Sequence, residues 1–185
     1  MQGKINLYDF SLLLYLRKFH NMSKHEFQEP AALSSVAKFH DVFNLPVLSA
    51  PAIPSADRCK LRYSLLAEEL DELKEAMENG DIVEAADALA DLQYVLSGAI
   101  LELGLAGIFK DLFDEVQRSN MSKTCKSMDE ALQTQQFYLQ QKQMESYIVE
   151  REGEFLVYRK EDGKVLKSVA YSPADLSTIV RASLV

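Results

Sequence analysis

Residues 68–91 read EELDELKEAMENGDIVEAADALAD, and ten of these positions are acidic while only Lys74 is basic. Apolar residues recur at spacings of three and four through both halves of this stretch and its flanks: Leu66, Leu70, Leu73 and Met77, then Ile82, Ala85, Leu89, Leu92 and Leu96. That period gives each half one apolar stripe, which predicts a helix on each side of the centre.

The centre of the stretch, Asn79-Gly80-Asp81, predicts a tight turn between the two helices. Gly80 tolerates the positive φ that ends a helix, and the side chain of Asp81 can cap the next one. The two helices are therefore expected to run antiparallel. Because both rise equally per residue, residues equally far from the turn lie at the same height.

This geometry brings six carboxylates onto facing stripes, with Glu72 level with Asp87, Glu68 with Asp91 and Glu75 with Glu84. Carboxylates at close range raise one another's pKa values unless something positive lies between them. Hard divalent cations, Mg²⁺ above all, take oxygen ligands of this kind and keep open positions for water and phosphate. The stretch thus predicts a magnesium site between two helices.

A solvated helix surface is the alternative interpretation of the same acids. The acidic stripes lie roughly opposite the leucine stripes, and Asp81 with Glu84 fits a capping box that needs no metal. Two features favour the metal site. Leu61, Leu65 and Val95 continue the acidic face, and an ordinary exposed face alternates charge signs to form Glu–Lys pairs.

Glu68-Glu69-x-x-Glu72 followed by Glu84-x-x-Asp87 resembles the acidic motif of the all-α nucleoside triphosphate pyrophosphohydrolases, which include the MazG-like enzymes, phosphoribosyl-ATP pyrophosphohydrolase and the dimeric dUTPases. Three further runs are similar to one branch of that superfamily: ADALADLQYVLSGAILELGL (86–105), EVQRSNMSK (115–123) and EDGKVLKSVAYSPADL (161–176). The resemblance extends from about Val36 to Leu176. It implies that carboxylates hold Mg²⁺ or Mn²⁺ and that the α–β phosphoanhydride is split into a nucleoside monophosphate and pyrophosphate.

The expected site follows from the acids and from this resemblance. Glu68, Glu69, Glu72 and Asp87 are expected as the core metal-binding set, with Glu84 and Asp91 next. Glu69, one position off the main stripe, is the expected general base. By resemblance, Asn120 and Lys123 approach the substrate, and Lys164 and Lys167 close over the nucleotide. Lysines near strand edges also serve only to prevent aggregation, so that interpretation stays open for the last two.

Three other residues near the acids each have two interpretations. Tyr94 can stack on a base or pack in the core. His40 matches a Phe-His pair of the same branch, although a lone histidine beside an apolar face is usually structural. Arg62, one turn before the acids, can reach phosphate or lie on the surface.

Composition bounds the class of protein. The 185 residues carry a net charge of −8, which makes nucleic acid a poor partner. Cys59 and Cys125 form no metal or redox motif and are expected to be free thiols. The apolar stretch INLYDFSLLLYLRKF near the start contains Asp9 and is too short to span a bilayer, so an amphipathic helix and a cytoplasmic protein without membrane contact are expected.

We therefore predict an all-α helical bundle with a small C-terminal antiparallel β appendage. The expected parts are a helical extension (1–34), the pyrophosphohydrolase-like domain (35–145) and a β-hairpin or meander (146–185). Within them we expect a proline-rich linker at 45–56, Asp57 as the cap of the first long helix, and helices at about 106–118 and 127–144. The expected activity is Mg²⁺-dependent hydrolysis of (d)NTP by a homodimer or larger assembly. Phosphoribosyl-ATP pyrophosphohydrolase and a non-catalytic interaction module remain the alternatives.

Overall fold

The computed structural model describes residue 25 and residues 27–184. The helix expected at about 7–20 lies outside the described residues. The chain divides into two compact units, residues 1–31 and 32–185, and all the helices and strands described below belong to the second unit.

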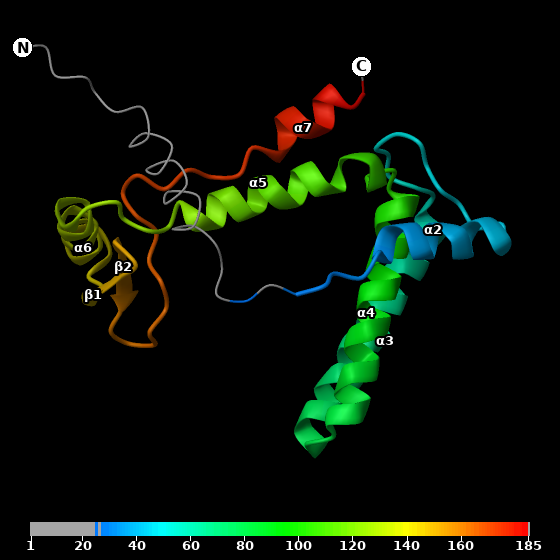
Figure 1. Cartoon of the computed structure of the whole chain (residues 1–185), viewed down its shortest axis with the longest axis horizontal. Coiled ribbons are helices and arrows are strands. Elements are labelled where there is room, and N and C mark those ends of the chain that lie inside the picture. The colour runs from blue at the N-terminus through cyan, green and yellow to red at the C-terminus, as the bar shows by residue number, and fades with distance from the viewer. Residues whose placement is uncertain (1–24, 26, 185) are drawn as a thin grey trace, which may run out of the picture. The chain divides into compact units, whose positions relative to one another are not determined.

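Within its described residues, the second unit contains six α-helices, one 3₁₀ turn and a two-stranded antiparallel sheet (Figure 1). In chain order these are α2 (Ala32–Val42), α3 (Ala56–Asn79), α4 (Ile82–Glu102), η1 (Ala106–Ile108), α5 (Phe109–Met121), α6 (Met128–Lys142), β1 (Ser146–Arg151), β2 (Glu154–Arg159) and α7 (Leu176–Ala182). The predicted fold class, all-α with a small C-terminal β appendage, is confirmed.

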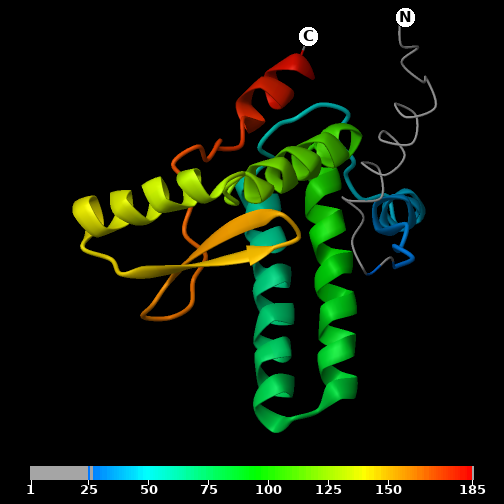
Figure 2. The same cartoon turned by 60° about the vertical axis from the view of Figure 1, so that its left-hand side comes forward.

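Helices α3 and α4 form the predicted antiparallel hairpin and lie side by side along their length (Figures 1 and 2). Gly80 ends α3 with φ of +70°, and the Asp81 carboxylate accepts the backbone N–H groups of Val83 and Glu84 at 2.9 and 3.1 Å. The prediction that Asp57 caps α3 is wrong. Ser55 occupies the cap position, and Asp57 lies in the first turn, where an acid still interacts favourably with the helix dipole.

A buried ionic cluster holds α2, α3 and α4 together at the end of the hairpin away from the turn. Glu102 of α4 is only 1% exposed and forms ion pairs with Arg58 and Arg62 of α3. Arg62 also donates to His40 Nε2 at 3.1 Å, and His40 Nδ1 lies 2.9 Å from the carbonyl oxygen of Pro46. The interpretation of Arg62 as a surface arginine is therefore wrong, because its side chain is only 13% exposed, while its contact with phosphate stays a prediction; buried His40 has a structural role.

The linker before α3 packs against the C-terminal end of α4. The backbone N–H groups of Leu48 and Ala52 donate to the carbonyls of Leu101 and Leu103, each at 3.1 Å. Gly104 lies under this linker with φ of +67°, and a Cβ atom added there would be 1.9 Å from the carbonyl oxygen of Ala50. The linker thus needs a glycine at this position for two reasons, backbone conformation and space.

We expect Gly104→Ala to lower the free energy of unfolding by at least about 2 kcal/mol, because the left-handed backbone alone costs about 1–2 kcal/mol for a residue with a Cβ atom. Gly80→Ala is the matched control, since Gly80 has a similar φ of +70° but no atom within 4 Å of an added Cβ. Urea denaturation of both variants measures the difference. Equal losses would show that the linker moves aside without cost.

The C-terminal region contains a small core of its own. Helix α6 packs against both strands around Cys125, Ala131, Val157 and Leu166. Glu152 and Gly153, with φ of +55° and +78°, form the predicted turn between β1 and β2. The expected third strand is reduced to a single bridge between Tyr158 and Val165.

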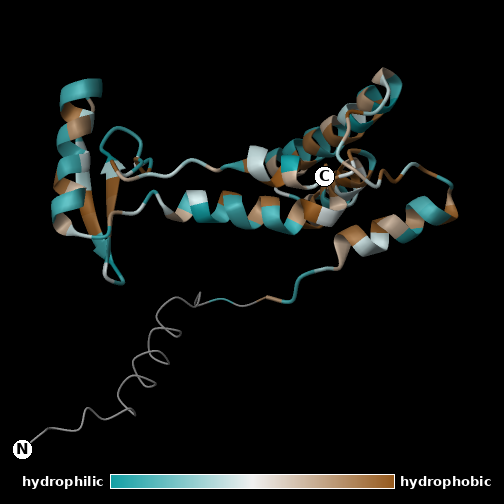
Figure 3. Cartoon of the chain, turned by 90° about the horizontal axis from the view of Figure 1, so that it is seen from above, coloured by the Kyte–Doolittle hydropathy of each residue, from teal (hydrophilic) through white to brown (hydrophobic). Residues whose placement is uncertain are grey.

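The hydropathy of the surface is mixed. Hydrophobic and hydrophilic segments alternate along α5 and α6 (Figure 3). Cys59 and Cys125 are free thiols, as expected. Among the described residues no single helix has the length and hydropathy needed to cross a membrane, and one pair, Ile82–Glu102 with Ala106–Met121, bent by 106°, meets that criterion by length and composition only when counted together.

Candidate active site

Glu69 is at the centre of the acidic cluster on the hairpin. It is half-buried, and its Oε2 atom is buried without a hydrogen-bond partner among the described residues. Burial raises the pKa of Glu69, and the charges of Glu72, Asp91, Glu68 and Asp87 raise it further. The hairpin thus brings four of the other five predicted metal-binding acids close enough to raise the pKa of Glu69.

The remaining acid of the predicted set, Glu84, lies nearer the turn. Together with Glu72 and Glu75 it lines a polar hollow of about 340 Å³ that also contacts Asn79 and Asp81. Glu72 therefore borders both regions. Glu75 lies as far from the turn as Glu84, as the hairpin register predicted, and Glu72, three residues before Glu75 on α3, lines the same hollow.

The cluster suits a divalent cation by the chemistry of its donors. Within the described part of the chain, no three His, Cys, Asp or Glu side chains converge closely enough to hold a metal ion as they stand. Nevertheless, the surrounding carboxylates offer only hard oxygen ligands, and the buried, unpartnered oxygen of Glu69 faces no positive side chain. Such an oxygen lacks the partner that buried polar atoms normally have, and a cation would supply one.

An apolar hollow of about 270 Å³ lies one helical turn beyond the acids. Its lining includes Leu65, one turn before Glu68 and Glu69, and Tyr94, one turn after Asp91. The Tyr94 ring meets Phe39 of α2 edge to face, with ring centroids 5.7 Å apart, and remains 39% exposed. Phe39 was not predicted here, although its place on the apolar side of α2 was a usable signal.

The predicted substrate-binding residues at the end of α5 gather around a tyrosine that sequence reasoning missed. Lys123 donates to the Asn120 side-chain oxygen at 2.8 Å, and Lys167 lies over the Tyr171 ring at 4.2 Å from its centroid. A hydrogen bond with Ser119 lowers the pKa of Tyr171, assisted by the charges of Lys167 and Lys123. No sequence signal joined Tyr171 to these lysines, because 48 residues separate it from Lys123.

Lys164 lies apart from that group. Its backbone N–H donates to the Asp162 carboxylate at 3.1 Å, and its carbonyl accepts the N–H of Arg159 at 2.9 Å. Asp162 is also paired with the side chain of Arg159, so this turn is held by local interactions. The exposed side chain of Lys164 therefore belongs to the turn after β2.

The acids and the α5 end are well separated within one chain. Asp91 and Glu102 are eleven residues apart on α4, Phe109 and Asn120 are eleven apart on α5, and the two helical segments are bent by 106°. At 1.5 Å per residue, each of the two eleven-residue segments is about 16 Å long. At this angle, their far ends, Asp91 and Asn120, are about 20 Å apart. One chain thus presents the carboxylates and the lysines as two groups.

Two comparisons with known proteins found similar sequences, and one of them covers the hairpin and its acids. Residues 36–120 match the sequence model of the family described as phosphoribosyl-ATP pyrophosphohydrolase. The chain is also 35% identical over 75 residues to "Uncharacterized protein L479" of Acanthamoeba polyphaga mimivirus, an alignment that covers 38% of this chain and 30% of that protein. The chain therefore matches less than a third of the length of that relative.

The family match begins in α2 and ends in the last turn of α5, so it includes the whole hairpin and every predicted metal-binding acid. It supports an activity of the nucleotide pyrophosphohydrolase type. Residues 36–120 of this chain therefore match a phosphoribosyl-ATP pyrophosphohydrolase domain, a family that is part of the MazG-like superfamily of nucleoside triphosphate pyrophosphohydrolases.

Proposed function

We propose that this protein is a Mg²⁺-dependent nucleoside triphosphate pyrophosphohydrolase, which converts a (d)NTP to a (d)NMP and pyrophosphate. The observation that carries this proposal is the unpartnered, buried oxygen of Glu69 among four further carboxylates. Such a group has no stabilising partner in the part of the chain that the structure describes, and a cation that holds phosphates would supply one. The family of residues 36–120 supports the reaction class.

Each acid has a role in this mechanism. Glu68, Glu72, Asp87 and Asp91 would hold Mg²⁺, with Mn²⁺ as a substitute, and Glu84 would assist from the hollow nearer the turn. A bound cation would supply positive charge against the phosphate oxygens and make a nearby water more acidic. Glu69, whose buried oxygen has no hydrogen-bond partner among the described residues, would accept a proton from the attacking water.

The apolar hollow beside the acids fits the nucleoside part of the substrate. It is lined mainly by apolar and aromatic side chains, and Tyr94 offers an exposed ring face at the end nearer Asp91. A base stacked on Tyr94 would place its phosphates toward the carboxylates one turn away. Tyr94 is therefore the proposed stacking residue.

The phosphate-binding lysines are proposed to act from a second copy of the chain. The estimated separation of about 20 Å within one chain is too long for Asn120 and Lys123 to reach phosphates held at Asp91. The hairpin also exposes many apolar side chains, including Leu70 (53%), Met77 (63%), Ile82 (79%) and Leu89 (54%). An apolar surface of this kind is normally covered by a partner. In a homodimer, the second copy would cover this surface and would also supply the lysines.

Product analysis tests the proposed reaction. The full chain is incubated with Mg²⁺ and each common (d)NTP, and nucleoside monophosphate and pyrophosphate are quantified. Phosphoribosyl-ATP is assayed in parallel, because the family of residues 36–120 takes its name from that activity. Hydrolysis of phosphoribosyl-ATP alone would replace the proposed substrate, and no hydrolysis of any nucleotide would indicate a non-catalytic interaction module.

Magnesium should raise the melting temperature, because a ligand that binds only the native state stabilises it. At a concentration 100-fold above Kd the expected gain is about 2.7 kcal/mol. Differential scanning fluorimetry with MgCl₂ against NaCl of equal ionic strength measures the shift. An equal melting temperature in both salts would contradict a magnesium site.

A further inference from the structure

Strand β1 has one edge that no other strand of the described chain covers. Lys160 N–H donates to Glu145 O at 2.9 Å, which fixes the alternation of bonded and non-bonded pairs along the β1–β2 ladder. By that alternation the backbone groups of Ser146, Ile148 and Glu150 point away from β2. The amide of Gln135 confirms this direction, since it donates to Ser146 O at 2.7 Å.

The opposite edge of the hairpin is already occupied. Phe155 exchanges two backbone hydrogen bonds with Cys125, at 2.8 and 2.9 Å, and Val157 O accepts the N–H of Leu166 at 2.8 Å. β2 is therefore an interior strand, and β1 is the edge at which the sheet can be extended.

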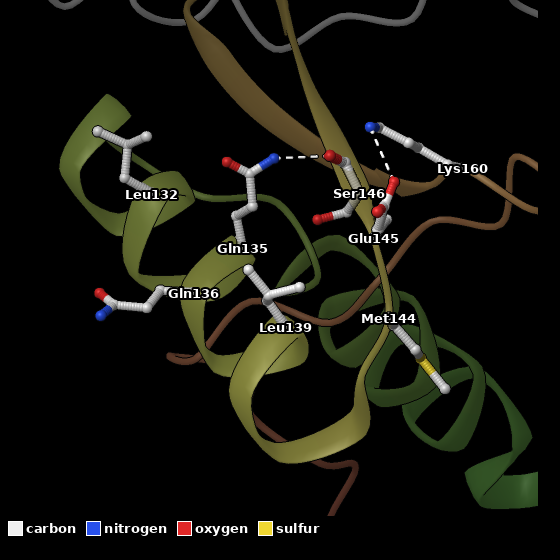
Figure 4. Close-up of a pocket in the computed structure, with 8 residues that line it drawn as sticks. All are labelled: Leu132, Gln135, Gln136, Leu139, Met144, Glu145, Ser146 and Lys160. Carbon is white, nitrogen blue, oxygen red and sulfur yellow. Dashed lines mark hydrogen bonds and ion pairs between the residues drawn. The ribbon is translucent and has the colours of Figure 1, made fainter.

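Helix α6 presents apolar side chains on the same side as this edge. Leu132 and Leu139 are 50% and 53% exposed, and they line a hollow of about 460 Å³ beside Met144 and Ser146. Figure 4 shows these side chains along α6 next to the start of β1, with Gln135 reaching across to Ser146. The edge and the apolar helix surface form one continuous face.

Three polar groups on β1 lack partners within the described chain. The Ser146 hydroxyl is buried without a hydrogen bond. The side chains of Glu150 and Arg151 are exposed, and neither takes part in a hydrogen bond or ion pair found among the described residues. The Ser146 hydroxyl thus lacks a partner among the described residues, and the two opposite, solvent-exposed charges are available to pair with another chain.

We propose that β1 pairs antiparallel with β1 of a second copy of this chain, about a twofold axis at Ile148. In this register Ile148 faces Ile148 of the second copy, and Ser146 faces Glu150. The outward backbone groups of Ile148 and Glu150 and the N–H of Ser146 then form hydrogen bonds, and Ser146 O, which already accepts from Gln135 at 2.7 Å, gains a second donor. Two sheets of two strands become one continuous sheet of four.

Side-chain chemistry selects this register among those that the backbone allows. Glu150 of one copy lies opposite Ser146 of the other, on the α6 face, where a carboxylate can accept from the buried hydroxyl. Arg151 lies opposite Glu145 of the other copy. Glu145 pairs with Lys160 of its own chain at 3.0 Å, so Arg151 adds a second cation to this carboxylate on each side of the axis. A shift of two residues either way would place Arg151 opposite Gln143 or Tyr147 and lose both ion pairs.

The proposed pairing also covers the apolar side of α6. A twofold axis perpendicular to the sheet places both α6 helices on the same face, next to each other. Leu132 and Leu139 of the two copies then meet, which removes them from water. A second copy thus forms hydrogen bonds with the edge of β1, pairs with its exposed charges and buries the apolar side of α6. None of these contacts depends on the proposed activity.

Disulfide trapping tests the register. Glu145→Cys and Arg151→Cys are made singly and together in a Cys59→Ser background, because Cys59 is the accessible native thiol and Cys125 is buried. Under mild oxidation the double variant should give a band at twice 20.9 kDa on a non-reducing gel. Each single variant should stay monomeric on that gel, because its own cysteines lie about 20 Å apart across the axis, six residues along a strand.

Glu150→Pro and Glu150→Ala are each added to the double-cysteine variant. Together they distinguish the contribution of the Glu150 backbone N–H to the pairing from that of its side chain. Proline removes an N–H that β2 does not use, so the β1–β2 ladder stays intact while pairing with the second copy is blocked. We expect Glu150→Pro to abolish the crosslink and Glu150→Ala to retain most of it, with both variants folded by circular dichroism. Three results would overturn the proposal: crosslinking by either single-cysteine variant, no crosslinking by the double variant, or crosslinking that persists in the proline variant. The edge of β1 would then be open to an extended segment of another protein.

Discussion

Glu72→Gln should lower kcat/KM for pyrophosphate release by at least about 100-fold, because even the outer partners of metal ligands contribute 10–100-fold. Glu72 influences the pKa of Glu69 and also lines the hollow that holds Glu84, so it borders both parts of the acidic site. Glutamine keeps nearly the same shape and loses the charge. The loss should therefore come from the cation and not from the fold.

The control is Glu78→Gln on the same helix. Glu78 is 65% exposed, pairs with Lys74 at 3.7 Å and is not among the acids that raise the pKa of Glu69. Activity against MgCl₂ concentration is measured for both variants, together with their melting temperatures in Mg²⁺. Full activity in Glu72→Gln, or an equal loss in Glu78→Gln, would contradict the proposed site.

Glu102→Ala should destabilise the protein by about 3–5 kcal/mol, the usual cost of removing one partner from a buried ion pair. Glu102 is 1% exposed and accepts from Arg58 and Arg62, which are themselves only 29% and 13% exposed. Without the carboxylate, two arginines remain partly buried beside His40. The matched control is Asp114→Ala, since Asp114 pairs with the exposed Lys110 on the surface of α5 and should change stability little.

The same carboxyl group makes stability depend on pH. Burial on its own raises the pKa of Glu102, but hydrogen bonds from Arg58 and Arg62 and their charges outweigh it and hold the pKa below the ordinary 4.5. A depressed pKa contributes stability above 4.5, and this contribution is lost as pH falls through the folded-state value. Melting temperatures from pH 6 to 3 should fall less steeply in Glu102→Gln than in the wild type; parallel curves would contradict this account.

The sequence predicted the hairpin because its signals are local. The apolar period, the glycine with positive φ and the capping aspartate each act within a few residues, and the structure has all three where they were expected. The same register placed Glu72 and Glu75 near Glu84. The prediction that Asp57 caps α3 was wrong because serine and aspartate are both common N-cap residues and stand two positions apart here. The helix begins after Ser55, where the linker ends.

The roles of Arg62, His40 and Tyr171 required the tertiary structure. Arg62 meets Glu102 across 40 residues, and Ser119 meets Tyr171 across 52, so no short-range pattern indicates either contact. The sequence could show that Glu102 is acidic but not that it is buried. Likewise, only the pairing of β1 with β2 reveals which backbone groups of β1 remain free.

The amino-acid order by itself determined two helices, their turn and the stripe of acids, because backbone propensities and helical period depend on neighbours in the chain. Packing decided which charges are buried, which carboxylates surround Glu69 and which strand edge stays open. Those properties depend on distances between segments far apart in the sequence. They are set by how apolar surfaces and ion pairs satisfy one another when the helices and strands come together.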